Sequence, residues 1–182
     1  MYIYNPLKDL SYSELILDPD QSYHTSLDQQ KLYFFFKNLK KPKDIDHIVG
    51  LYIEYLIEPY IYEQFPQFYH KFSPKIEECI VAQLNFGNAN LYHDYSQKFF
   101  IVMFNATEDD ILKAYLNLNH YFNKHPFEYH HHQCLIQLKC GAYFAQPGIH
   151  PYQLYISAKD QFDMIAHKEK SIISMNYFRL AR

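Results

Sequence analysis

Histidines are the first side chains in this sequence that could do chemistry, because imidazole is the commonest protein ligand for transition metals. Four of the eleven lie close together, where His125 is followed by the run His130-His131-His132. Adjacent residues of a strand point to opposite faces, so three in a row cannot all chelate one ion. The sequence also contains neither an HExxH nor a CxxC pattern. We therefore expect a solvated loop here and no metal site.

The three cysteines, Cys79, Cys134 and Cys140, are odd in number and form no metal-binding or redox pair by spacing. This favours reduced thiols over a disulfide framework. No neighbouring feature would lower a thiol pKa, which argues against a cysteine nucleophile. Cys134 and Cys140 are expected on one strand an even number of residues apart. They would then share a face and pack in the core.

The stretch LYHDYSQKFFIVMF, residues 91–104, has the form of a loop that delivers side chains to the start of a buried strand. The polar tetrapeptide Tyr95-Ser96-Gln97-Lys98 leads directly into six apolar residues. His93 and Asp94 beside Ser96 have the letters of a hydrolase triad. Triads are defined by geometry, however, and neighbours in sequence seldom meet in that way. A polar turn that enters a strand is the interpretation we adopt.

The elements that would position these groups alternate between helices and strands, which predicts an α/β or α+β sheet with helices packed on it. Apolar spacing and capping signals predict helices over 26–41, 74–84, from Thr107 to about 124, and 158–170. Pro74 is expected just inside the start of its helix. Branched and aromatic residues predict strands over 47–57, 99–104, 134–145, 152–156 and 172–178.

Composition places these elements in one globular domain. The chain has 182 residues, of which 48% are hydrophobic and 20% charged. Residues 1–20 form a polar arm and residues 21–182 the domain. The net charge of −3, with no basic stripe, argues against nucleic acid as a partner. The N-terminus lacks the pattern of a signal peptide, and the apolar runs are too short to span a bilayer. We expect a cytoplasmic protein.

The segment from Pro59 to Phe72 is unusually aromatic and is broken by Pro59 and Pro66, so its secondary structure is left open. One interpretation is that its rings fill a former active site or form an exposed protein-binding surface. The other is ordinary core together with a compositional bias toward tyrosine and phenylalanine. The candidate surface comprises Tyr60, Tyr62, Phe65, Phe68 and Tyr69.

Four stretches follow one another at the spacing of a known family: HTSLDQQKLY (24–33), YHDYSQKFFIVMF (92–104), LKCGAYFA (138–145) and SAKDQFDMIAHKEKS (157–171). In order, they resemble the opening L-T-G-L-x-N-R-R-x-F signature, the R-Y-G-G-D-E-F loop, the S-I-G-V-A strand and the closing helix of GGDEF domains. The chain thus resembles a diguanylate cyclase domain over roughly residues 22–180. The resemblance implies a nucleotidyl-cyclase-like fold, a central and mostly antiparallel sheet surrounded by helices.

The resemblance places the G-G-D-E-F signature at Tyr95, Ser96, Gln97, Lys98 and Phe99, so four of its five residues are replaced in this chain. The cyclase reaction needs divalent metal on carboxylate oxygens, and an ammonium cannot be a ligand. The resemblance places Glu54 at the other metal position, where we expect it to pair with Lys98. Residues 56–75 lack the guanine-reading motifs, and FGNA (86–89) replaces the inhibitory R-x-x-D. We therefore expect a degenerate domain that is not an enzyme and holds no metal or other cofactor.

The resemblance implies a regulatory or protein-interaction module in a bacterial pathway of cyclic di-GMP signalling, surface attachment or motility. Its partner would be another protein, with a second copy of the chain as a further candidate. The alternative is a non-catalytic sensor that keeps GTP or cyclic di-GMP in the old pocket, with Lys98 on a phosphate. The family assignment also requires residues 91–94 to form a hairpin with strand 99–104.

Overall fold

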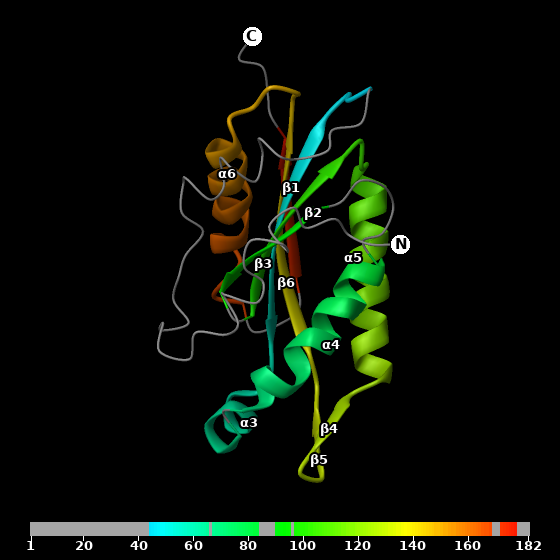
Figure 1. Cartoon of the computed structure of the whole chain (residues 1–182), viewed down its shortest axis with the longest axis vertical. Coiled ribbons are helices and arrows are strands. Elements are labelled where there is room, and N and C mark those ends of the chain that lie inside the picture. The colour runs from blue at the N-terminus through cyan, green and yellow to red at the C-terminus, as the bar shows by residue number, and fades with distance from the viewer. Residues whose placement is uncertain (1–43, 66, 84–89, 96, 169–171, 178–182) are drawn as a thin grey trace.

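The computed structural model describes residues 44–177, apart from 66, 84–89, 96 and 169–171 (Figure 1). The expected helix 26–41, the opening stretch 24–33 and the N-terminal arm 1–20 lie outside the described residues. The division into an arm and a domain therefore stays a prediction. Within the described residues, a central sheet carries helices on both of its faces (Figure 1).

The central sheet has five strands in the order β2-β3-β1-β6-β7. Its strands are β1 (Ile48–Leu56), β2 (Asn90–Tyr95), β3 (Lys98–Phe104), β6 (Gln137–Ala145) and β7 (Ile172–Tyr177). All neighbours pair antiparallel except β6 and β7, which are parallel. A second, two-stranded sheet joins β4 (Phe127–Tyr129) to β5 (His132–Cys134). The expected strands 47–57, 99–104 and 172–178 are confirmed within one or two residues over their described part.

Alternation along β1 divides the core into two layers, because successive side chains of a strand point to opposite faces. Ile53 and Tyr55 face a larger apolar cluster that includes residues of α4 (Phe68–Gln83) and α5 (Glu108–Lys124). Tyr52 faces a smaller cluster on the other side, formed with α6 (Pro151–Asp163). Figure 1 shows α6 on one side of the sheet and α4 and α5 on the other.

Thr107 begins α5 with a capping box, as its sequence position predicts. Its hydroxyl accepts a hydrogen bond from the Asp110 amide at 3.2 Å, and the Asp110 carboxylate accepts one from the Thr107 amide at 2.9 Å. These bonds satisfy donors that the first helical turn would otherwise leave without partners. The helix then buries Ile111, Ala114, Tyr115, Leu118 and Phe122 along one stripe.

The start of α4 corrects the prediction for residues 74–84. The helix begins at Phe68, so Pro74 lies inside it rather than in its first turn. A proline there removes one backbone hydrogen bond, but the apolar stripe continues across it: Phe68, Phe72, Ile76 and Ile80 recur every four residues. Phe68, Ile76 and Ile80 are completely buried. Burial of this stripe outweighs the local preference of proline. Before it, α3 (Pro59–Gln64) forms a short separate helix.

The predicted strand 152–156 is wrong, because these residues belong to α6. His150 caps this helix by accepting a hydrogen bond from the Tyr152 amide at 3.3 Å, and Pro151 occupies its first turn. Leu154, Tyr155, Ala158 and Phe162 are buried at helical spacing. The aromatic and branched letters of YQLYI favoured a strand, whereas the proline start and the stripe that continues to Phe162 decide the helix.

The predicted strand 134–145 is two elements. Cys134 ends β5, Leu135 and Ile136 connect, and β6 begins at Gln137. Cys134 and Cys140 therefore do not share a strand face as expected, although both are buried in the larger cluster and both are free thiols.

No helix in the described part of the chain is long and apolar enough to cross a membrane.

Candidate functional site

The loop that was singled out in the sequence connects β2 to β3. The two strands pair antiparallel from Asn90↔Val102 to Tyr95↔Lys98, with an irregularity between His93 and Tyr95. The expected hairpin between residues 91–94 and strand 99–104 is thereby confirmed. The Gln97 carbonyl accepts a hydrogen bond from the Tyr55 amide at 3.1 Å, which ties the loop to the end of β1. Phe99 is completely buried in the larger cluster.

Glu54 and Lys98 meet at this end of the sheet. They are register partners on β1 and β3, and the Lys98 Nζ lies 3.4 Å from the Glu54 Oε1. The predicted ion pair is therefore confirmed. The Lys98 side chain is 30% exposed and the Glu54 side chain 12%. The same ammonium lies 5.4 Å from the ring centroid of Phe162, which belongs to α6.

A second lysine stands on the other side of Glu54, and sequence reasoning missed it. Lys139 of β6 is the register partner of Glu54. It is only 6% exposed, and its Nζ donates a hydrogen bond to the Ala166 carbonyl at 2.5 Å. Lys98, Glu54 and Lys139 thus form one row across β3, β1 and β6, which we call the strand-end row. The available signal was the lone charge within the apolar stretch LKCGAYFA.

Within the described residues, no three histidine, cysteine, aspartate or glutamate side chains come together as metal ligands would. His130 and His131 occupy the turn of the β4–β5 hairpin with φ angles of 48° and 66°. His125 ends α5, where its Nδ1 lies 3.0 Å from the Tyr121 carbonyl oxygen. The side chains of His93, Asp94 and Ser96, which have the residue types of a triad, are outside the described part of the structure.

The candidate interaction surface is only partly as expected. Tyr60 is 45% exposed and Phe65 is half-buried. Phe68 is wrong as a surface residue, because it is the first residue of the apolar stripe of α4 and is completely buried. The side chains of Tyr62 and Tyr69 lie outside the described part of the structure.

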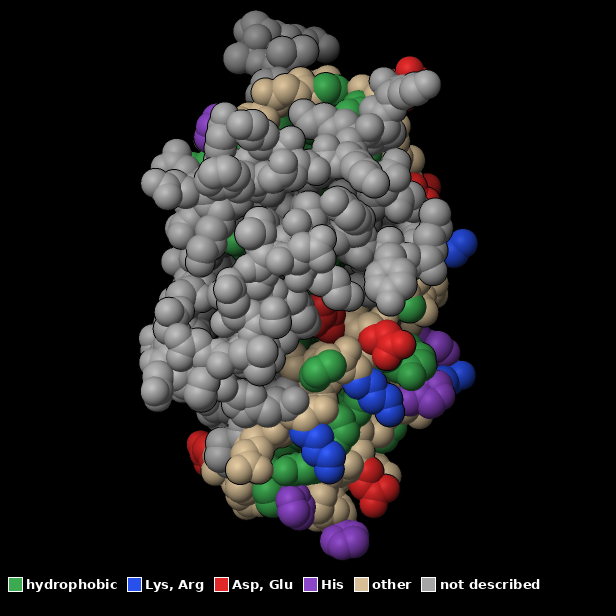
Figure 2. Space-filling model, viewed as in Figure 1, with side chains coloured by type: hydrophobic (Ala, Val, Ile, Leu, Met, Phe, Trp, Pro, Cys, Tyr) green, Lys and Arg blue, Asp and Glu red, His purple; other side chains and the backbone are tan. Residues whose placement is uncertain are grey.

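The β4–β5 hairpin adds rings to the two surface residues. The His130 ring stacks on Phe65 with centroids 4.9 Å apart and planes 11° apart. The His132 ring lies 5.6 Å from Phe65 and 6.3 Å from Tyr60, and Tyr129 meets His130 edge-on at 4.4 Å. We call Tyr60, Phe65, Tyr129, His130 and His132 the hairpin-tip cluster. Figure 2 shows histidine and lysine side chains gathered at this lower end of the molecule.

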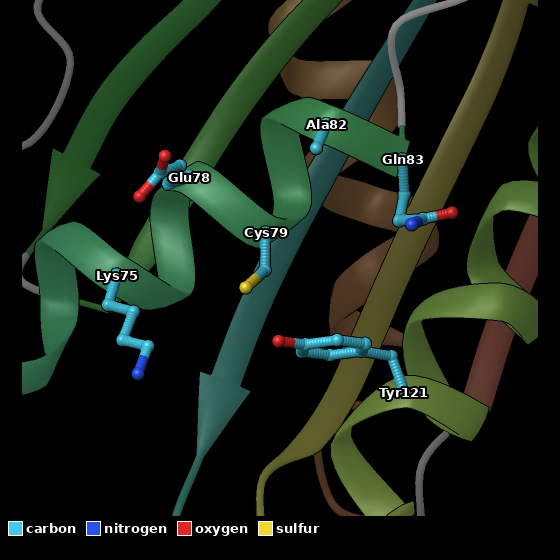
Figure 3. A pocket seen from close by; sticks show the side chains of 6 residues that line it. All are labelled: Lys75, Glu78, Cys79, Ala82, Gln83 and Tyr121. Carbon is cyan, nitrogen blue, oxygen red and sulfur yellow. The ribbon is translucent and has the colours of Figure 1, made fainter. Parts of the chain in front are cut away.

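A shallow cavity of about 330 Å³ lies between α4 and α5. Figure 3 shows the Cys79 thiol and the Tyr121 ring turned toward each other across it. Burial raises the pKa of the Cys79 thiol, and a hydrogen bond with the Tyr121 side chain offsets part of this shift. A raised pKa keeps the thiol protonated and makes it a poor nucleophile. The cavity is lined by Lys75, Glu78, Cys79, Ala82, Gln83 and Tyr121.

The comparisons with known proteins point to one fold. No family model matches the chain, and no curated protein matches it in sequence. Among solved structures, the GGDEF domain of FimX from Pseudomonas aeruginosa matches with a TM-score of 0.61 and 16% identity, over 72% of this chain and 81% of that chain. The chain has the GGDEF fold. The predicted fold class is confirmed: a mixed α+β fold with a mostly antiparallel sheet flanked by helices.

Two further structures agree. The GGDEF domain of PA1120 (YfiN or TpbB) from P. aeruginosa matches with a TM-score of 0.61 and 13% identity, over 83% of this chain and 94% of that one. The active GGEEF domain of a diguanylate cyclase from Vibrio cholerae matches with a TM-score of 0.54 and 14% identity, over 75% and 85%. The similarity extends over most of each solved domain.

These structures overturn the expectation that the chain is not an enzyme. It has the fold of GGDEF domains, and one of the matching domains is described as active. The expectation rested on the missing signature letters of the β2–β3 loop, of residues 56–75 and of residues 86–89, and both Ser96 and residues 86–89 are outside the described residues. Substituted letters in a loop do not exclude catalysis when the hairpin that carries the loop is present and Glu54 still stands at the end of β1.

Proposed function

We propose that the chain is a regulatory domain of bacterial cyclic di-GMP signalling, in the cytoplasm, and that it acts by binding another protein through the hairpin-tip cluster. The GGDEF fold supports the pathway. The hairpin-tip cluster carries the proposal for the mode of action. This cluster includes the exposed ring of Tyr60. The pathway that we propose is one of signalling, surface attachment or motility.

The composition of the hairpin-tip cluster suits a protein interface. Tyrosine and phenylalanine supply large contact areas at a low cost in side-chain entropy, and they are enriched where partners bind. Stacking of His130 on Phe65 holds the hairpin against the segment between α3 and α4. Lys71 adds a cation 4.8 Å from the Tyr129 ring centroid. The rings are thus held in place before a partner arrives, which lowers the entropic cost of binding.

The hairpin turn gives independent support. Two-residue turns with positive φ at both central positions strongly prefer Asn-Gly or Asp-Gly. Here both positions are histidine, with φ angles of 48° and 66°. Non-glycine residues in this region of backbone space carry a conformational cost of about 1–3 kcal/mol each, and such strained positions cluster at functional sites. The strain supports a role for the imidazole side chains that a glycine turn could not supply.

Site-specific photo-crosslinking tests this function. A photoreactive phenylalanine analogue replaces Tyr60 in the full chain, in its native host, and Lys113 on the outer surface of α5 serves as the control site. We expect a discrete protein adduct from position 60 that is lost when Phe65→Ala is added, and no such adduct from position 113. Equal adducts from both positions would overturn the proposal. A band at twice the mass of the chain would identify a second copy as the partner.

Catalysis is measured alongside, because the fold is that of diguanylate cyclases. The full chain is incubated with GTP and Mg²⁺ or Mn²⁺, and cyclic di-GMP is quantified by chromatography. Its appearance would add an activity to the regulatory role, and the crosslinking result would still decide whether the hairpin-tip cluster binds protein.

The second candidate function is the binding of GTP or cyclic di-GMP at the end of the central sheet. The observation that favours it is Lys98, whose partly exposed ammonium lies where the family resemblance places metal and phosphate. Calorimetry with GTP, GMP and cyclic di-GMP tests it, and the absence of heat at millimolar ligand would remove it.

A further inference from the structure

The strand-end row has more positive than negative charge. Two lysines flank one glutamate on directly opposite positions of three adjacent strands. Side chains at directly opposite positions on neighbouring strands project from the same face of the sheet. On this face, Lys98 lies over Phe162 of α6, and Lys139 bonds the Ala166 carbonyl just after α6. These three side chains together carry a net charge of +1, and they lie between the strand ends and the end of α6.

Burial makes this imbalance costly. Lys139 is 6% exposed, and Glu54, the only carboxylate of the row, is ion-paired with Lys98. The Ala166 carbonyl satisfies one of the three N–H donors of the Lys139 ammonium, but it carries no full charge. A desolvated cation is stabilised most by an anion, because Coulomb interactions strengthen as the local dielectric constant falls.

The geometry of the ion pair allows an anion to compete for Lys98. The distance of 3.4 Å between the Lys98 Nζ and the Glu54 Oε1 exceeds the roughly 2.7–2.9 Å of a strong charge-assisted hydrogen bond. The Lys98 side chain is also partly exposed, so its ammonium can turn toward a ligand. Lysine is a compact point charge that suits the oxygens of a phosphate group.

We propose that the strand-end row binds a phosphate group of a nucleotide directly through Lys98 and Lys139, without a divalent metal ion between protein and phosphate. This deepens the second candidate function and is independent of the hairpin-tip cluster. A metal at Glu54 would sit beside the Lys98 ammonium and be repelled by it, whereas a phosphate gains from both lysines.

The proposal inverts the role of Glu54. In a site that uses metal, this carboxylate holds the cation that holds the phosphate, so its removal abolishes binding. In the strand-end row, Glu54 competes with the phosphate for Lys98 and repels it. Glu54→Gln keeps the size of the side chain and removes its charge. We therefore expect Glu54→Gln to strengthen phosphate binding.

The test uses calorimetry on the full chain, with inorganic pyrophosphate, GTP and cyclic di-GMP, in EDTA and again in Mg²⁺. We expect binding in EDTA and a Kd about 3–10 times lower for Glu54→Gln, which corresponds to the loss of one partly screened charge. Lys98→Met should raise the Kd about tenfold or more. Lys159→Met is the matched control, because Lys159 is a partly exposed lysine that is paired with Asp163 on α6 and does not belong to the row, and it should bind as the unaltered chain does.

The ligands distinguish the source of the phosphate. Pyrophosphate binding shows that the phosphate group alone suffices, and tighter GTP or cyclic di-GMP binding identifies the nucleotide. Tyr60→Ala should bind all three as before, so the loss of the proposed protein interface and the loss of phosphate binding are separable.

Lys139→Met tests the buried cation, with circular dichroism to establish that the variant is folded. Lys139→Arg retains the charge and should retain binding. If Lys139→Met does not fold, Glu54→Gln and Lys98→Met still decide the matter. The proposal is overturned if binding requires Mg²⁺, if Glu54→Gln weakens binding, or if no ligand binds in EDTA at millimolar concentration.

Discussion

At the scale of single residues, the ion pair between Glu54 and Lys98 links two strands but does little to hold them. Lys98 is 30% exposed and the atoms are 3.4 Å apart. Solvent-exposed pairs contribute about 0–1 kcal/mol, and the partly exposed Lys98 keeps this pair near that range although Glu54 is only 12% exposed. In a double-mutant cycle of Glu54→Gln and Lys98→Met, we expect a coupling free energy below about 1 kcal/mol from urea unfolding. A coupling several times larger would show that the pair is effectively buried.

Gly141 of β6 sits against the backbone of α6. A Cβ added at this position would lie 2.2 Å from the Phe162 amide nitrogen and 2.5 Å from the Ala158 carbonyl oxygen. Backbone cannot turn aside as a side chain can, so Gly141→Ala must push α6 away from the sheet. We expect it to lower the free energy of unfolding by about 3 kcal/mol or more, at or beyond the upper end of the usual cost of overpacking.

Gly50→Ala provides the comparison. At Gly50, the nearest atom to an added Cβ is the side-chain Cγ of Leu154, at 2.9 Å. A leucine can change rotamer, so this variant should lose clearly less stability in the same urea titration. Equal losses at the two positions would contradict the close approach of α6 at Gly141.

At the scale of elements, α5 depends on its capping box. Thr107→Ala removes the side chain that accepts from the Asp110 amide and donates to the Asp110 carboxylate. We expect a loss of about 1 kcal/mol in the free energy of unfolding at pH 7. Thr107→Ser retains the hydroxyl and should lose much less. Urea titrations at pH 7 measure both.

The same cap predicts a pH dependence. Hydrogen bonds from the Thr107 hydroxyl and amide lower the pKa of Asp110 below its ordinary value of 3.8. A lowered pKa means that the folded state binds the proton less readily than the unfolded state does. The stabilisation is therefore complete above about pH 4 and is lost as the pH falls through the lower, folded-state pKa. The stability difference between the native chain and Thr107→Ala should shrink over that range, and a constant difference would exclude the contribution of Asp110.

Helices and strands with a strong local sequence signal could be predicted. Those whose structure depends on packing against other elements could not. Strands β1 and β3 are long apolar runs, and Thr107 has the letters of a cap, so sequence sufficed. Residues 152–156 have a local preference for a strand, but the buried stripe of α6 makes them helical. Pro74 would favour the start of a helix, but the buried stripe of α4 places it inside one. Both helices are fixed by packing against the sheet, which local propensity does not contain.

The candidate site divides in the same way. The pair of Glu54 with Lys98 followed from aligning two signatures of one family, which implies the register between their strands. Lys139 was missed because its strand matches the family only by its apolar letters, and nothing local shows that it stands opposite Glu54. Phe68 was misplaced because aromatic composition alone does not say which rings face the core.

At the scale of the whole molecule, the accessibility of the three cysteine thiols measures how readily the packed helices and sheet open. Burial raises the pKa of Cys134, and more strongly that of Cys140. Both are free and buried, whereas Cys79 is half-buried beside the cavity between α4 and α5. At pH 8 we expect a thiol reagent to label the native chain slowly at Cys79 alone. The other two should react only when the fold opens.

The variant Cys79→Ser makes this measurement unambiguous. Its native state should give no labelled thiol over minutes, and urea should release two. Rapid labelling of two thiols without urea would show that the layers over β5 and β6 open more easily than the burial of Cys134 and Cys140 implies.

The position of β1 in the middle of the sheet has a consequence for synthesis on the ribosome. Its partner β3 is made only after α3, α4 and β2, and its partner on the other side, β6, is made later still, after α5 and the β4–β5 hairpin. Until then, the apolar edge of IVGLYIEYL has no native neighbour. Pairing that closes so long a loop is slow, and open apolar strand edges recruit other chains. A chain halted between β3 and β6 should therefore aggregate or engage chaperones.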